Sequence, residues 1–67
     1  MDLIENIRVF RRVAETKSFS AVAREREVTQ PSISKSIQAL EAELGVTLLR
    51  RTTRGLSLTP EGERLYH

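Results

Sequence analysis

Four polar side chains, none of them acidic, recur on one side of a segment with helical periodicity. They are Gln30, Ser34, Lys35 and Gln38. Glutamine, serine and lysine can donate or accept hydrogen bonds at base edges in a DNA major groove. The chain has no acidic residue between Val28 and Leu40, so nothing on this stretch repels phosphates. The pattern predicts a helix face that reads duplex DNA.

Two neighbouring residues belong to the same predicted surface. A rotation of about 100° per residue places Pro31 beside Ser34 and Lys35, and Ser32 at the edge of the face. A serine hydroxyl at that edge is available to a backbone phosphate. Ser18, Ser20 and Thr29 are interpreted first as helix caps and only second as phosphate contacts.

Three arginines lie in a second acid-free segment, between Leu44 and Pro60. Arg54 precedes Gly55, and an arm carrying it can reach a minor groove, where the negative potential attracts guanidinium groups. Arg50 or Arg51 would then hold phosphates. The alternative is that these arginines only form a charged hairpin edge.

Catalytic residue sets are missing from the sequence. There is no cysteine, the single histidine is His67, and no serine stands in a nucleophile motif with a base. The acids Glu25 and Glu27 fit a solvated surface better than a catalytic pair. We therefore predict no enzyme activity, no cofactor and no metal site.

Size and charge limit the remaining choices. The 67 residues suffice for one small domain, whose formal net charge is +2. Neither a secretory signal nor a membrane-length apolar run is present, so the expected location is the cytoplasm and no membrane contact is expected.

Two helices are predicted in the first part of the chain. Asp2 resembles a cap for a helix that ends near residues 16–17, and Ser18 offers a cap for a second helix over about 19–26. The buried stripe of the first helix is predicted to comprise Leu3, Ile7, Phe10 and Ala14, flanked by Ile4 and Val13.

A third helix, over about 30–44, is expected to carry the reading face. Thr29 is a good N-cap, Pro31 is tolerated in the first turn, and Gly45 is a natural stop. Its buried stripe is predicted to comprise Ile33, Ile37, Leu40 and Leu44.

The rest of the chain predicts a β hairpin and the start of a helix. Strands are expected around residues 50–52 and 56–59, joined through 53–55, where Gly55 permits a tight turn. Pro60 after Thr59 then signals a helix start. The predicted fold class is mainly α: a winged helix-turn-helix, with a three-helix core and a two-stranded β wing. An ordinary three-helix bundle with a polar face is the alternative.

Several stretches resemble the LysR-type transcriptional regulators. They are SFSA at 18–21, VTQPSIS at 28–34, IQALE at 37–41, ELGV at 43–46, LLRRTTRG at 48–55 and LTPEG at 58–62. The resemblance implies an N-terminal DNA-binding domain over 1–59, with the helix-turn-helix at about 18–38 and the wing at about 49–59. Residues 60–67 would be the start of a linker helix, cut short.

The resemblance implies sequence-specific double-stranded DNA binding in bacterial transcription regulation. Positions matching Gln30, Pro31, Ser34 and Lys35 would read bases, and Arg54 would enter the minor groove; Gln38 is added from helix geometry. The intact regulator would be a homodimer or higher homo-oligomer, with a small-molecule effector bound only by a C-terminal domain. The rival function is a winged-helix module that binds protein without DNA.

The sequence departs from the family pattern in the second helix. Arg26 stands where the family usually has leucine, and Val22 where it usually has a small residue; Leu49 replaces a common aromatic. We expect Arg26 to lay its methylenes along the core and keep its charged head in water.

Overall fold

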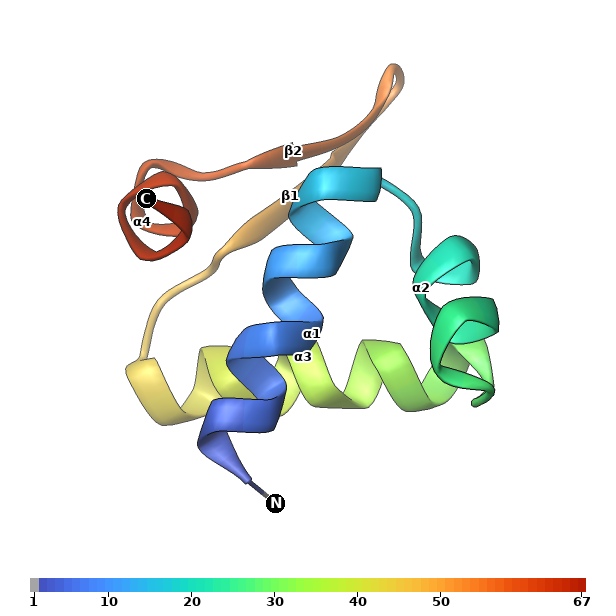
Figure 1. The fold of residues 1–67 in the computed structure, drawn as a ribbon. Helices are drawn as coiled ribbons and strands as arrows, with labels where there is room; N and C mark the ends of the chain where they lie inside the picture. The colour runs from blue at the N-terminus through green and yellow to red at the C-terminus, as the bar shows by residue number, and fades with distance from the viewer. Residues whose placement is uncertain (1) are drawn as a thin grey trace.

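The computed structural model describes residues 2–67 and consists of three helices, a hairpin and a short final helix (Figure 1). The elements are α1 (Leu3–Thr16), α2 (Phe19–Arg26), α3 (Gln30–Leu44), β1 (Leu49–Thr52), β2 (Gly55–Leu58) and α4 (Pro60–Tyr66). This order confirms the predicted winged helix-turn-helix.

Every helix begins at a side chain that caps its first turn. The capping oxygens of Asp2, Ser18, Thr29 and Thr59 accept hydrogen bonds from backbone N–H groups two or three residues later. Gly45 ends α3 with φ 70°, as predicted. The helix boundaries therefore follow from signals close to them in the chain.

The core lies where α1 and α2 pack against α3. Its fully buried large side chains are Phe10, Val13, Val22, Ile33, Leu40 and Leu48. The predicted stripe of α3 is confirmed at Ile33, Ile37 and Leu40 but is wrong at Leu44, which is 42% exposed. Leu44 occupies the last turn of α3, beyond the stretch that α1 crosses (Figure 1).

The buried face of α1 is rotated from the predicted one. Its buried residues are Asn6, Val9, Phe10 and Val13, whereas Leu3 is 41% exposed and Ile4 is 61% exposed. Ile7 and Ala14 are only half-buried. In the first turn, Leu3 is partly covered because it lines a hollow with Ala39 and Glu43 of α3, whereas Ile4 is mostly exposed.

The wing is a two-stranded antiparallel hairpin in which Leu49 pairs with Leu58 and Thr52 with Gly55. Both strands therefore begin one residue earlier than predicted, and Gly55, at φ 118°, belongs to the ladder instead of the connection. Thr59 is not in the second strand. Its buried hydroxyl donates to the Thr47 carbonyl and accepts from the Gly62 amide at the start of α4.

The backbone of α4 lies in close contact with Leu48, directly before the wing. A Cβ atom added to Gly62 would lie 2.1 Å from the carbonyl oxygen of Leu48. Real Cβ atoms do not approach an oxygen this closely, so only glycine fits here. Of the helices in residues 2–67, none has the length and apolar character needed to cross a membrane.

Arg26 does not behave as predicted. Its side chain is 28% exposed, Nη1 donates to the Glu5 carboxylate on α1, and Nε is buried without a partner in the described part of the chain. The expectation that its head stays in water is therefore wrong at Nε, although the side chain as a whole keeps part of its surface exposed. The side chain lies against α1 because Glu5 offers a counter-charge there, while Val22 fills the core beside it with no exposed surface.

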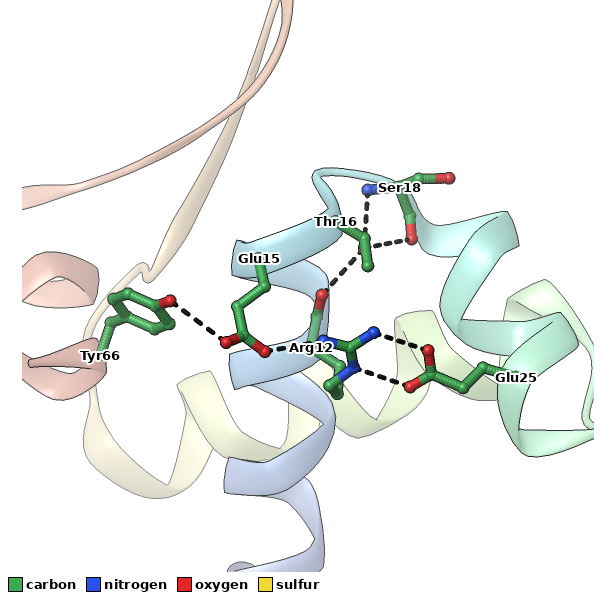
Figure 2. Close-up of polar contacts among 6 residues, drawn as sticks. All are labelled: Arg12, Glu15, Thr16, Ser18, Glu25 and Tyr66. Atoms are coloured by element: carbon green, nitrogen blue, oxygen red, sulfur yellow. Dashed lines mark hydrogen bonds and ion pairs between the residues drawn. The ribbon is translucent and has the colours of Figure 1, made fainter.

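A chain of polar contacts joins α4, α1 and α2 (Figure 2). The Tyr66 hydroxyl donates to Glu15 Oε2 at 3.4 Å, and Arg12 Nη1 donates to Glu15 Oε1 at 2.9 Å. Arg12 also donates from Nε and Nη2 to the two oxygens of Glu25, each at 2.7 Å. These bonds lower the pKa of Glu25 and raise the pKa of Arg12.

Candidate nucleic-acid interface

The first half of α3 presents the predicted polar face to solvent. Gln30, Pro31, Ser32, Lys35 and Gln38 are exposed, and Ser34 is half-buried. Thr29 sets the start of the helix, and the stripe of Ile33, Ile37 and Leu40 fixes which side faces outward. The face is therefore held by a cap at one end and by core packing along its length.

The wing brings Arg51 beside the N-terminal end of this face. Phe19, Gln30, Pro31, Ser34 and Arg51 line one hollow together. A neighbouring hollow of about 240 Å³ has side chains from α2, α3 and the wing around it. Its lining residues are Lys17, Phe19, Ser20, Gln30, Arg51, Thr52, Gly55 and Leu56. Neither lining contains an acidic residue, so both hollows suit an anionic group.

Arg54 lies exposed at the tip of the wing, away from the α3 face. Thr52 Oγ1 accepts from the Arg54 backbone N–H at 3.2 Å and donates to the Gly55 carbonyl at 3.2 Å, which ties the turn together. Arg50, opposite Ser57 in the ladder, is also exposed. The structure thus brings Arg51 to α3, while Arg50 lies on the opposite face of β1 and Arg54 lies at the tip of the wing.

Ion pairs gather on α1, α2 and α4 and leave the candidate interface free. Among residues 2–67, Lys35, Arg50, Arg51 and Arg54 take part in no ion pair. The carboxylates that neutralise other arginines stand on α1 and α2. A modest net charge thus coexists with a surface whose cations keep their full attraction for phosphates.

Phe19 is part of the site but is absent from the sequence-based selection. Its ring lies under the Arg51 guanidinium, with 4.8 Å between Cζ and the ring centroid. The one available signal is an aromatic residue directly after the Ser18 cap, at the exposed start of a helix. Within residues 2–67 we find no group of three or more His, Cys, Asp or Glu side chains arranged to hold a metal.

Residues 4–63 match the family described as bacterial regulatory helix-turn-helix protein, lysR family. The chain belongs to the LysR family. This match covers most of the chain and confirms the family predicted from the sequence.

Two LysR-family relatives from Escherichia coli strain K12 are similar over nearly the whole chain. The uncharacterized HTH-type transcriptional regulator YhjC is 48% identical over 66 residues, and the HTH-type transcriptional regulator DmlR is 47% identical over 66 residues. Each alignment covers 98% of this chain and 22% of the relative. The chain thus spans about a fifth of the length of these regulators.

A solved DNA complex has the same fold. The structure of the BenM DNA-binding domain with catB site 1 DNA has a TM-score of 0.87 and 42% sequence identity, covering 98% of this chain and 73% of that one. The LysR-type winged helix-turn-helix is thereby confirmed as the fold.

Proposed function

We propose that this LysR-family chain binds specific double-stranded DNA sites and thereby regulates transcription, with α3 in a major groove and the wing in a minor groove. The observation that carries the proposal is the acid-free exposed face of α3 beside wing arginines that have no ion-pair partner among residues 2–67. The similarity to the BenM domain solved on DNA supports it.

Each element has a separate task in this proposal. The bases are read from α3, by the side chains of Gln30, Pro31, Ser34, Lys35 and Gln38. Ser32 and the wing arginines Arg50 and Arg51 bind phosphates, which set position but carry no sequence information. Arg54, at the exposed tip, enters the minor groove.

The proposal extends to the intact regulator. We assign residues 1–59 to the DNA-binding domain and 60–67 to the start of a linker helix that pairs two heads on a near-palindromic site. A small-molecule effector would bind in the part of the regulator that lies outside the matched region. The proposed location is the cytoplasm, and the proposed role requires no catalysis.

The test is selection from a randomised duplex pool at several salt concentrations. We expect a defined half-site to be enriched and the affinity to fall steeply with salt, because phosphate neutralisation releases counterions. Gln30→Ala should change the selected sequence, whereas Glu43→Gln, in the last turns of α3, should not. No binding even at low salt would overturn the proposal and favour a protein-binding module. An unchanged selection with Gln30→Ala would overturn the assignment of the reading helix.

A further inference from the structure

Arg51 is a charged residue in the inward-facing row of the wing. Alternation along β1 puts it on the same side as Leu49, and its partner across the ladder is Leu56. Both leucines pack against the hydrophobic core. Arg51 itself remains exposed, because its guanidinium group lies over the ring of the half-buried Phe19, at the edge of the core.

The contact with Phe19 has the geometry of a cation–π interaction. The separation of 4.8 Å between Arg51 Cζ and the ring centroid is within the range in which a ring face attracts a guanidinium group. Stacking uses no N–H group. Within residues 2–67 the Arg51 side chain donates to no protein acceptor. Two of the hollows that it lines contain no carboxylate. A third also contains Glu41, whose Oε2 accepts from the backbone N–H groups of Leu48 and Leu49 and forms no ion pair with Arg51. Its donors therefore remain available for a ligand.

The stacked guanidinium stands at the N-terminal end of the reading helix. Gln30 lines both hollows with Phe19 and Arg51, and Lys17 adds a second cation to the hollow of about 240 Å³. Planar guanidinium donors match phosphate oxygens in pairs. An arginine held here would fix a phosphate beside the first base-reading residue.

We propose that Phe19 is a positioning residue, which holds the Arg51 guanidinium over its ring so that Arg51 binds a DNA phosphate next to Gln30. The inference rests on the proposed function and adds a residue to it. Phe19 acts through Arg51: a free arginine side chain samples many rotamers, and the ring reduces that freedom before DNA arrives. Arg50 has no such ring beside it in the described chain and serves as the internal comparison.

The experiment is a double-mutant cycle in DNA affinity, using the 67-residue chain and the duplex selected above. Phe19→Leu should weaken binding roughly two- to fivefold, the range of an exposed cation–π contact. Arg51→Ala should weaken it further and reduce the slope of log affinity against log salt by about 0.9, one phosphate contact. In the Arg51→Ala background, Phe19→Leu should have no additional effect, whereas in the Arg50→Ala background it should keep its full effect.

Phe19→Trp should retain the wild-type affinity, because indole offers a stronger ring face. A purely structural role for Phe19 would instead appear as losses that add to those of Arg51→Ala, and that result would overturn the inference. Failure of every variant, wild type included, to bind any duplex would overturn the proposed function as well.

A second measurement uses only the wild-type chain, so it does not require any variant to fold. In the NMR spectrum of the free wild-type chain, the Arg51 side-chain protons should be shifted upfield by the ring current of Phe19, while those of Arg50 should not. Arg51 protons at ordinary shifts would show that the stack is not populated in solution, which overturns the inference without bearing on DNA binding itself.

Discussion

Arg26 on α2 donates to Glu5 on α1 through Nη1, while its Nε is buried with no partner among residues 2–67. Burial thus removes water from Nε without replacing it by a protein acceptor, and only Nη1 gains a hydrogen bond. A buried donor without a hydrogen-bond partner costs free energy, so an apolar side chain of similar volume can stabilise the fold more at this position.

Arg26→Leu is therefore expected to raise the free energy of unfolding by about 1 kcal/mol. Glu5 is partly exposed and can be solvated once Arg26 is removed. Urea unfolding measures the change, with Arg24→Leu at an exposed position of the same helix as the control. A less stable Arg26→Leu chain would mean that the ion pair outweighs the buried nitrogen.

Glu25 is expected to make stability depend on pH. Hydrogen bonds from Arg12 hold the Glu25 pKa below its ordinary value of 4.5. A lowered folded-state pKa stabilises the fold above the unfolded-state pKa, and this contribution disappears as the pH falls through the folded-state pKa. Wild type should therefore be modestly more stable than Glu25→Gln at pH 7, and the difference should vanish well below pH 4.5.

Thermal unfolding of both proteins across this pH range tests the prediction. Glu43→Gln is the matched control, since Glu43 forms no ion pair in the described residues. A Glu25→Gln difference that stays constant from neutral to acidic pH would contradict the assigned ion pair.

Gly62→Ala should destabilise the chain through a steric clash with the Leu48 carbonyl. Overpacking of this kind typically costs about 1–3 kcal/mol. Gly45→Ala is the informative comparison, because a Cβ at Gly45 meets nothing within 4 Å and only the φ of +70° opposes it, at about 1–2 kcal/mol. Only Gly62→Ala should also displace α4, which amide exchange in residues 60–66 would detect.

Arg54 should influence DNA binding according to minor-groove width. Arg54→Ala is expected to weaken binding more on duplexes whose half-site is flanked by A·T tracts than on those with G·C flanks, because A-tracts narrow the groove and deepen its negative potential. Arg50→Ala, a change at a proposed phosphate contact, should weaken both duplexes alike. The measurement is the affinity for two duplexes that differ only in the flanking sequence. An equal loss of affinity on both duplexes with Arg54→Ala would place Arg54 outside the minor groove.

Local signals predicted the helices better than the faces that they bury. Thr29 and Gly45 mark the ends of α3 because a cap acts on neighbouring backbone groups. Leu44 has the same spacing as its buried neighbours but is exposed, since burial depends on where another helix crosses. The periodicity of α1 similarly could not show that Leu3 and Ile4 in its first turn would remain exposed.

Contacts between distant residues were the least predictable part of the site. The Arg51 and Phe19 side chains meet only because the wing folds back toward the start of α2. The polar face of α3 was easier to predict, since helical rotation alone places Gln30, Ser34 and Lys35 together. In the wing, the first strand begins one residue before the predicted start and the second lies one residue earlier than predicted, because strand limits depend on cross-strand partners.

The four side-chain caps have a consequence for how the chain folds. Each of Asp2, Ser18, Thr29 and Thr59 bonds to an amide two or three residues away, so the signal that starts each helix involves no distant segment. Proteins dominated by such short-range contacts cross their folding barrier quickly. The three-helix body should assemble first, and the hairpin should join last, because Leu49 and Leu56 need a finished core to pack against.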